Sequence, residues 1–508
     1  MPPEPVPTIS SAEAVRASSI SSAGWAKWLD GGVYFFLCLF AILLPHSIKG
    51  AQHAWQIAAL LWLASLAMKR QRPFPQPLAL PLLAYLVLSA ISCLLSPDPY
   101  LSWAMMKRVC LVAVAILVAQ SLSRISQVRT LVFLLLLSGL AAAGFTAWQC
   151  VHGIGVEVNS PQPNSALARA GIRDGDVITA LDEHDVATAA QLQAAAERCA
   201  RGSIVRIQFL RGLPLRKRVT FAACEALRND LSDARGLRLA RARPMRAQGT
   251  LGHYGTFAET LMALGCLAWA MLLSTERRRR ALAALFGLIF LSLTLTLLAT
   301  QTRGAIAGLA LGCFVALQLL AGKRTRRWAY AFLVLFLVGA TFWIQHTRGL
   351  GWIAARDPGT QYRLMMWEDG WRLVRQHPLF GVGMDTVSKH WQEWGIRAYA
   401  VFHQQWHFHS DFVQIAVERG LLTLAAWLWF LVANFIFLRR LLVRVQARSR
   451  FATGVVAGAL AAWAAFLVRS AVEYSLYDET LMMLLFLLFG LAIAVERMLR
   501  TPGAIDVP

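Results

Sequence analysis

The sequence predicts an all-α polytopic membrane protein with about twelve transmembrane helices. Hydrophobic residues make up 57% of the 508 residues, and only 15% are charged. A soluble domain carries roughly 25% charged residues. Apolar runs also recur from residue 33 almost to the C-terminus, and a helix of about 20 apolar residues crosses a hydrocarbon core of about 30 Å. Composition and run length therefore agree on the fold class.

The apolar runs divide into a set of five helices and a later set of seven. The expected ranges are 31–48, 52–68, 77–96, 105–122, 129–150, 256–274, 281–299, 304–322, 328–345, 411–437, 452–470 and 478–496. The first 25 residues are polar and show no cleavable signal pattern. We therefore expect the first helix to direct the chain to the membrane.

The formal net charge of +22 predicts membrane orientation better than it predicts nucleic-acid binding. Short basic clusters border the apolar runs: KRQR at 69–72, ERRRR at 276–280, KRTRR at 323–327, LRRLLVR at 438–444 and RMLR at 497–500. With a cytoplasmic N-terminus, all five clusters fall on the cytoplasmic side, as the positive-inside rule requires. We expect both termini in the cytoplasm of a bacterium and the chain in its inner membrane. No aromatic-basic reading module accompanies the charge, so no nucleic-acid partner is expected.

This topology gives six regions. They are a cytoplasmic tail (1–30), helices one to five (31–150), a periplasmic module with a basic linker (151–250), helices six to nine (251–345), a periplasmic loop (346–410), and helices ten to twelve with a cytoplasmic tail (411–508). Loops of more than about 15 residues are usually functional or disordered. The loop 346–410 is rich in Trp and His, which argues against disorder, so we expect the chemistry there.

Residues 153–222 alternate short helical and strand patterns around Ala170-Gly171-Ile172 and Gly175-Asp176-Val177-Ile178. This stretch resembles a bacterial PDZ domain, an α+β module. The resemblance implies a groove beside Ile154 and Val156 and the helix at 189–199, where an extended peptide binds by strand addition. An inserted spacer with an idle groove is the alternative. The Arg-rich linker 228–246 is expected to be irregular or to lie on the membrane.

Three further segments fall on the periplasmic face in this topology. Their motifs are Thr302-Arg303-Gly304, Tyr362-Arg363 with Trp367, His377-Pro378-Leu379 before Gly381-Val382-Gly383, and His409 with Gln414, Glu418 and Gly420, preceded by Arg246 with Gly249-Thr250-Leu251-Gly252. Together they resemble the O-antigen ligase and polymerase superfamily over about residues 244–440. Many relatives carry Asn after the motif histidine, where this chain has Ser410.

The resemblance implies a role for each candidate residue. Arg303 and Arg363, with Arg246 upstream, would bind the diphosphate of the donor, because a guanidinium fork holds phosphate oxygens and stays charged. His409 would take the proton of the acceptor hydroxyl, and His407 remains a second candidate. Gln414 and Glu418 would support them. A carboxylate near the membrane, such as Glu418 or Glu473, is expected to pair with an arginine of the site.

The predicted function is an inverting, metal-independent glycosyltransferase. It would move a glycan from undecaprenyl diphosphate to a hydroxyl of lipid A-core at the periplasmic face, without a cofactor. A repeat-unit polymerase and a protein O-oligosaccharyltransferase are enzymatic alternatives, and a transporter or scaffold with a peptide-binding module is the non-enzymatic one. Expected partners are membrane lipid, the lipid-linked donor, a lipid A-core or protein acceptor, and a peptide of the PDZ-like module.

Overall fold

A computed structural model describes residues 11–69, 77–322, 358–397 and 407–500, together with parts of 326–342. Within 77–322, residues 160, 162, 201, 212–215, 233–237 and 243–245 are not described. The expected helix 328–345 lies largely outside the described residues, as do 346–357 and 398–406 of the expected loop. The chain forms two compact units. The first is Met1–Ser138, Met262–Phe290 and Arg303–Pro508, and the second is Gly139–Leu261 and Leu291–Thr302.

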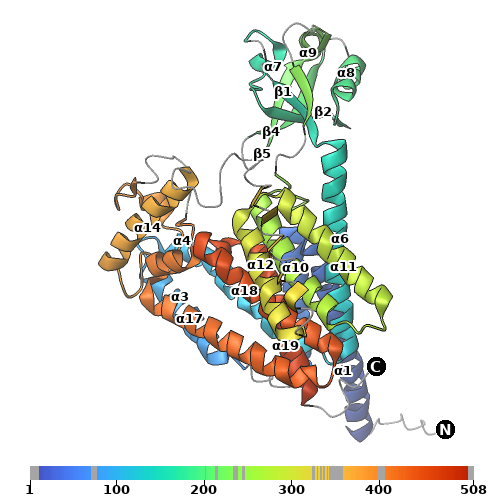
Figure 1. Ribbon diagram of the computed structural model, residues 1–508, viewed down its shortest axis with the longest axis vertical. Helices are drawn as coiled ribbons and strands as arrows, with labels where there is room; N and C mark the ends of the chain where they lie inside the picture. Colours follow the sequence, from blue (N-terminus) through green and yellow to red (C-terminus); the bar gives the residue numbers. More distant parts are fainter. Residues whose placement is uncertain are drawn as a thin grey trace, which may run out of the picture. The chain divides into compact units, whose positions relative to one another are not determined.

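Helices form most of the chain (Figure 1). The helical elements outside the inserted module are α1 (Ser11–Leu43), α2 (Ile48–Lys69), α3 (Ala79–Leu94), α4 (Pro99–Val109), η1 (Cys110–Val112), α5 (Ala113–Ser121), α6 (Ile125–His152), α10 (Tyr254–Ser274), α11 (Arg280–Ala299), α12 (Arg303–Leu320), α14 (Pro358–Gln376), α15 (Val387–His390), α17 (Asp411–Gln446), α18 (Arg450–Val472), η2 (Ser475–Tyr477) and α19 (Glu479–Leu499).

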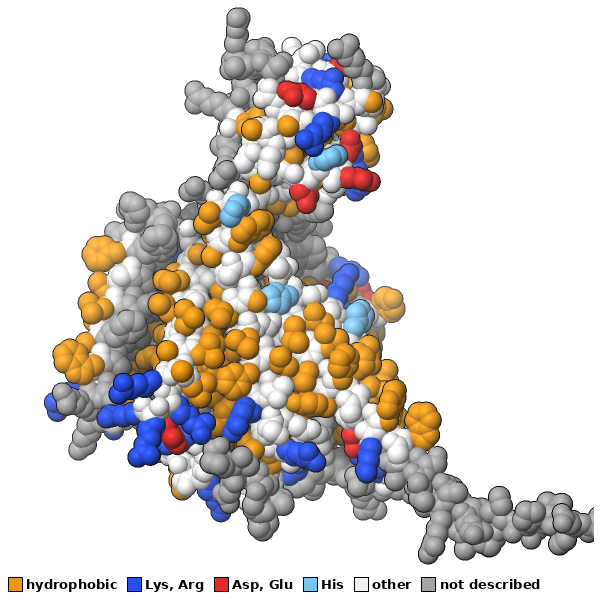
Figure 2. Space-filling model, turned by 90° about the vertical axis from the view of Figure 1, so that its right-hand side faces the viewer, with side chains coloured by type: hydrophobic (Ala, Val, Ile, Leu, Met, Phe, Trp, Pro, Cys, Tyr) orange, Lys and Arg blue, Asp and Glu red, His pale blue; other side chains and the backbone are white. Residues whose placement is uncertain are grey.

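Nine spans among the described residues are long and apolar enough to cross a membrane, and α3 is a shorter apolar helix. The all-α polytopic membrane fold predicted from the sequence is therefore confirmed. On the face drawn in Figure 2, hydrophobic side chains form a broad band and Lys and Arg side chains gather along one border of it. That distribution suits a helical protein in a bilayer, where the apolar surface faces lipid and the charges lie at an interface.

The first unit places α17 at the centre of several helix contacts. It packs against α18 and α3, while α12 packs against α18 and α14 against α17. The helix is interrupted at Gly420, whose φ of 80° and ψ of 170° are not helical. At this break the segment 378–383 binds to α17 through three backbone hydrogen bonds: Leu421 N–H to Pro378 O (2.8 Å), Val382 N–H to Val417 O (2.9 Å) and Gly383 N–H to Glu418 O (2.8 Å).

The close approach explains two motif glycines. A Cβ on Gly420 would lie 2.0 Å from the Leu379 carbonyl oxygen, and one on Gly381 would lie 2.4 Å from the Val417 carbonyl oxygen. Both glycines have positive φ, 80° and 68°, a region that residues with a Cβ rarely adopt. Backbone geometry therefore requires glycine at both positions.

The second unit contains the inserted module, whose sheet has the strand order β5-β4-β2-β1-β6, with β3 paired to β2. Its elements are β1 (Gly155–Asn159), α7 (Ala166–Arg169), β2 (Asp176–Leu181), β3 (His184–Asp185), α8 (Ala189–Arg198), β4 (Ile204–Arg211), β5 (Arg216–Ala223), α9 (Cys224–Ser232) and β6 (Arg238–Ala242). Buried residues of β1, β2, β4, α8 and α9 share one hydrophobic core. The predicted α+β insertion is confirmed.

The linker expected to be irregular is partly ordered, which corrects the prediction for residues 228–246. It contains the end of α9 and the strand β6. The reason is local burial, because Leu227 of α9 is 1% exposed and Leu239 of β6 packs against the same core. The prediction gave weight to the many arginines of this segment and did not take Leu227 and Leu239 into account.

Replacing Gly420 by Ala tests the importance of the break in α17. We expect Gly420→Ala to lower the free energy of unfolding by at least about 2 kcal/mol, because the added Cβ meets backbone atoms and the positive φ is strained. The measurement is thermal unfolding of the purified chain in detergent. The control is Gly287→Ala on α11, where no atom lies within 4 Å of the added Cβ. Equal melting temperatures for the two variants would contradict this explanation.

Candidate active site

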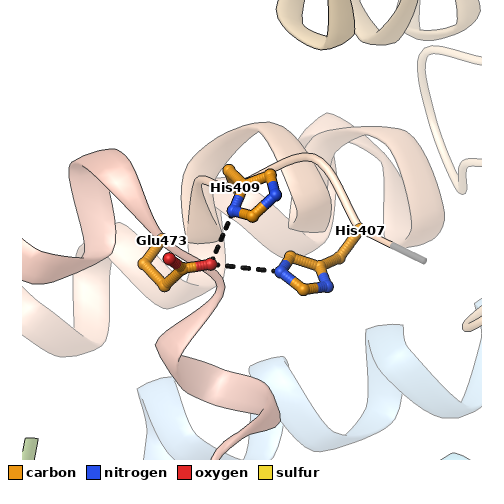
Figure 3. Close-up of side chains that lie close together, drawn as sticks. All are labelled: His407, His409 and Glu473. Carbon is orange, nitrogen blue, oxygen red and sulfur yellow. Dashed lines mark hydrogen bonds and ion pairs between the residues drawn. The ribbon is translucent and has the colours of Figure 1, made fainter. Parts of the chain in front are cut away.

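Glu473, the residue that follows α18, joins two histidines from a distant part of the chain. Its Oε1 atom lies 2.7 Å from Nδ1 of His409 and 3.1 Å from Nε2 of His407 (Figure 3). Both histidines precede α17, so the arrangement depends on the packing of α17 against α18. One carboxylate oxygen therefore orients two imidazole rings, whose centroids are 4.4 Å apart.

The other oxygen of the same carboxylate faces two arginines. Arg469 Nη2 lies 3.4 Å from Glu473 Oε2, and Arg363 Nη2 lies 3.9 Å from it. Arg469 stands one helical turn before Glu473 on α18, whereas Arg363 comes from α14. Fixed positive charge therefore surrounds the imidazole–carboxylate pair. The pairing of a near-membrane carboxylate with a site arginine, expected from the sequence, is observed at Glu473.

Arg303 is the first residue of α12, and the residue after it contacts this cluster. A Cβ on Gly304 would lie 3.0 Å from Nη1 of Arg469. The first turn of α12 thus abuts the guanidinium that faces Glu473. The segments that carry Arg363 and His409 therefore meet at Glu473, and the segment of Arg303 adjoins them at Gly304.

The segment that carries the histidines is held by side chains of the family motifs. The Trp367 Nε1–H donates to the Phe408 carbonyl (2.8 Å), and the Phe408 N–H donates to Gln414 Oε1 (2.6 Å). Tyr362 meets the His409 ring edge-on with the centroids 5.7 Å apart. Gln414 and Trp367 therefore hold the backbone of Phe408, directly before His409, and do not touch the ring nitrogens of His409 through these bonds.

His409 also has a strained backbone, with a φ of 49°. A residue with a Cβ in this region costs on the order of 1–3 kcal/mol, and such residues cluster at functional sites. The side chain of His409 is only 9% exposed. The hydrogen bonds of Phe408 and of the His409 ring therefore hold the imidazole in one place and offset the strain in the backbone.

The electrostatics of the pair follow from this burial. Burial lowers the pKa of His409 below its usual range, an effect that the neighbouring Glu473 partly offsets. For Glu473, burial alone would raise the pKa, but His409, Arg469 and the hydrogen bond from His407 outweigh burial and hold the pKa of the carboxyl well below its usual range. At neutral pH the site therefore contains an ionised carboxylate beside a neutral imidazole.

A hydrogen bond from Nδ1–H of His409 to the carboxylate fixes the tautomer. In a neutral imidazole whose Nδ1 carries the proton, the basic lone pair is on Nε2. This arrangement of carboxylate and imidazole is the one that general bases use in hydrolases and transferases. This geometry fits the role of a base that the sequence predicts for His409, and that role stays a prediction. His407 presents Nε2 to the same carboxylate.

The ligand atoms of His407, His409 and Glu473 all lie within 4.8 Å of one another, a spacing that would suit a metal ion. Two imidazoles and a carboxylate are a common zinc ligand set. Here, however, the guanidinium groups of Arg363 and Arg469 face the same carboxylate. A divalent cation would meet two fixed positive charges at this distance.

Arg246 lies in the second unit and anchors a turn there. Its Nε donates to the Thr300 carbonyl (2.9 Å), and its Nη2 lies 3.1 Å from the Gln301 carbonyl and 3.3 Å from Thr302 Oγ1. Its guanidinium carbon is 3.5 Å from the centre of the Tyr254 ring. Arg246 therefore holds the turn directly before Arg303 in the chain, a positioning role that the motif alone does not show.

Glu418 is buried and occupies a different environment from the one expected. Its Oε1 accepts a hydrogen bond from the Asp385 N–H (2.7 Å). Arg419, next to it, donates to the Tyr85 hydroxyl (2.7 Å). These residues, with Arg108 and Tyr477, line a pocket between α3, α4, α17 and η2. Glu418 thus fixes the loop at Asp385 and does not orient Arg363 through any contact that the structure gives.

The sequence did not identify Arg469, Arg108 or Tyr477. Arg108 lies 3.6 Å from the centre of the Tyr477 ring, and that ring stacks on His407 at 6.5 Å. The available signal for Arg469 was its i, i+4 spacing to Glu473 at the end of an apolar helix, because ionisable residues in membrane segments are rare and usually paired. Nothing in the sequence linked Arg108 to Tyr477.

The predicted groove residues of the module lie at β1. Val156 is 0% exposed and belongs to the module core, and Ile154 precedes the strand. The Ile154 N–H donates to the Ala242 carbonyl of β6 (2.9 Å). The edge of β1 is therefore paired within the chain.

Comparison with known proteins agrees with both resemblances. Residues 288–428 match the family model described as O-antigen ligase, and residues 128–218 match that of the PDZ domain. The first match contains Arg303, Arg363 and both histidines. No curated protein matches the chain. The resemblance inferred from the sequence motifs, an O-antigen ligase with an inserted PDZ domain, is confirmed.

Proposed function

We propose that this chain, which carries an O-antigen ligase domain and an inserted PDZ domain, transfers a glycan from polyprenyl diphosphate to an acceptor hydroxyl at the periplasmic face of the inner membrane. The family match supports a ligase-type activity. The observation that carries the proposal is the His409–Glu473 hydrogen bond of 2.7 Å beside Arg363 and Arg469. A base next to fixed cations is what transfer from a diphosphate requires.

In the proposed reaction, the acceptor oxygen attacks the anomeric carbon while His409 Nε2 takes the hydroxyl proton. Glu473 stabilises the imidazolium that forms, because its carboxylate already faces Nδ1. The bond from the anomeric carbon to the diphosphate oxygen breaks, and polyprenyl diphosphate leaves with the electron pair. A single displacement of this kind inverts the configuration at the anomeric carbon.

Arg363 and Arg303 are the proposed partners of the leaving diphosphate. Negative charge on the leaving oxygen grows in the transition state, and guanidinium groups stabilise it without proton transfer. The Arg363–Glu473 separation of 3.9 Å is long for an ion pair, so Arg363 can exchange this contact for phosphate oxygens. Arg246 supports Arg303 by holding the turn at Thr300–Thr302.

The acceptor that we favour is lipid A-core, with undecaprenyl diphosphate as the lipid carrier. A repeat-unit polymerase would use the same chemistry with another donor as acceptor. A protein O-oligosaccharyltransferase is favoured by one observation, the PDZ domain, because such domains bind peptides. The cytoplasmic placement of both termini rests on the basic clusters at 276–280 and 438–444.

Single alanine substitutions test the site. We expect His409→Ala to lower the transfer rate by about 10²- to 10⁴-fold, the usual contribution of a general base. Arg363→Ala and Arg303→Ala should each lower it by about 10²- to 10³-fold, because one partner of the developing charge is lost. The assay is glycan transfer from a lipid-linked donor with purified variants in nanodiscs.

The matched control is Arg375→Ala on the same helix as Arg363. Arg375 is exposed and its guanidinium carbon lies 5.6 Å from the centre of the Trp371 ring. This variant should retain at least half of the activity. Full activity in the His409, Arg363 and Arg303 variants at normal protein levels would rule out the proposed site.

The dependence of kcat/KM on pH tests the role of His409 separately. Because the pKa of His409 is lowered, its neutral form persists below the usual value of about 6.5, and the acid limb should lie below that pH. Arg363→Gln removes a charge that lowers this pKa, so the limb should move to higher pH. Glu473→Gln removes a charge that raises it, so the limb should move to lower pH. Shifts in the same direction for both variants would exclude His409 as the titrating base.

Metal independence is tested by chelation. With the carboxylate of Glu473 already facing two guanidinium groups, no metal ion is needed to activate the acceptor. We expect transfer to continue unchanged after treatment with EDTA and dialysis into metal-free buffer. A loss of more than tenfold that Zn²⁺ or Mg²⁺ restores would show that this part of the proposal is wrong.

A further inference from the structure

The strand β6 occupies the position of a bound peptide in the PDZ domain. PDZ domains accept an extended peptide beside a strand and next to a helix, by strand addition. Here β1 pairs with β2 on one side and with β6 on the other. The register with β6 runs antiparallel from Gly155 opposite Ala242 to Asn159 opposite Arg238. The helix α8 also contacts β6.

The contacts of β6 resemble those of a ligand in both backbone and side chains. The Ile154 N–H donates to the Ala242 carbonyl (2.9 Å) at the glycine-flanked start of β1. Leu239 packs against the module core, and Ala242 is 2% exposed. Two apolar anchors three positions apart, joined to the strand edge by main-chain hydrogen bonds, are the elements by which strand addition gives affinity and specificity.

We propose that β6 is a tethered ligand of the PDZ groove, which an external peptide must displace to bind. The external partner is an extended peptide with a leucine-sized side chain at the Leu239 position and a small residue at the Ala242 position. A segment on a short tether has an effective concentration of the order of mM. Only a tightly binding or locally concentrated peptide therefore opens the groove.

Displacement of β6 would free the connection that leads into the membrane part of the chain. Residue 246 follows β6 closely, and Arg246 holds the turn at Thr300–Thr302. With the groove occupied, only three residues of sequence separate the end of β6 at Ala242 from Arg246. The proposal itself concerns peptide binding and does not depend on the transferase activity.

The test measures binding of a fluorescent peptide to the full chain in nanodiscs. The peptide has the sequence of residues 236–242, GLRLARA, and its negative control, GLRDARA, has aspartate in place of the leucine that corresponds to Leu239. Leu239→Asp in the chain removes the apolar anchor of β6 and leaves the groove intact. We expect this variant to bind GLRLARA at least tenfold more tightly than the wild-type chain and not to bind GLRDARA.

The matched control is Val219→Asp on β5. Val219 is 43% exposed and lies on the strand at the opposite end of the sheet order from β6. This variant introduces the same charge and should bind the peptide as weakly as the wild type. Equal affinity of all three chains for GLRLARA, or no binding to Leu239→Asp, would overturn the proposal.

Amide hydrogen exchange shows whether the module remains folded in the Leu239→Asp variant. If residues 204–211 in β4 stay protected in this variant, the module is intact and the peptide-binding result tests the proposal. If this protection is lost, the proposal is tested by hydrogen exchange in the wild-type chain. In mM peptide, exchange at residues 238–242 should accelerate while residues 204–211 stay protected. Unchanged exchange at 238–242 in the wild type would show that β6 is a permanent strand of the sheet.

Discussion

The carboxylate of Glu473 is the point on which the site depends. It faces His409 and His407 with one oxygen and Arg469 and Arg363 with the other. These five residues come from α14, from α18 and the residue that follows it, and from the segment before α17, so no single element can form the site alone. A partly buried carboxylate is stable as an anion only when charges and hydrogen bonds compensate the loss of water. Here the compensating groups include His409 and Arg363, to which the proposed reaction assigns roles.

The break in α17 serves the same arrangement. Because Gly420 leaves the helical conformation, the segment 378–383 can pair with residues 417–421 as a short non-helical ladder. Asp385, just after this segment, is supported by Glu418, which accepts a hydrogen bond from its N–H, and α17 begins at Asp411, two residues after His409. The glycine motifs of the family thus determine how the loop meets the first turns of α17. Their contribution to the site is geometric and not chemical.

Much of this architecture was predictable, and the reason differs from one part to another. Apolar runs showed the helices because a bilayer imposes their length, and the Gly-Asp turn at 175–176 showed the inserted module. The motif residues Arg363 and His409 were identified by resemblance. Hydropathy gives no information on the rotation of each helix about its axis. The contact of Glu473 with His409 and His407, which lie 64 and 66 positions earlier in the chain, was therefore not predictable. The strand β6 was not predicted because the sequence RLARA is typical of a basic linker. Its extended conformation depends on pairing with β1, which the sequence does not show.

The arginines illustrate the same limit. Arg246, Arg303 and Arg363 were assigned one role from their resemblance to a family motif. Arg246, however, donates hydrogen bonds to a turn, whereas Arg363 faces the carboxylate of Glu473. Arg108 and Arg419 line a separate pocket, which is a second place with positive charge. Charge alone therefore does not identify the residues that bind phosphate. The groups around each guanidinium determine whether it is available for that role.

The most direct measurement is a cryo-electron-microscopy structure of the full chain in a nanodisc with a non-transferable phosphonate analogue of a polyprenyl diphosphate glycan. The account predicts diphosphate density within hydrogen-bonding distance of Arg363, with the anomeric carbon on the side of His409 Nε2. Density for the diphosphate in the pocket of Arg108 and Arg419, with the His409–Glu473 pair remote from the glycan, would contradict it.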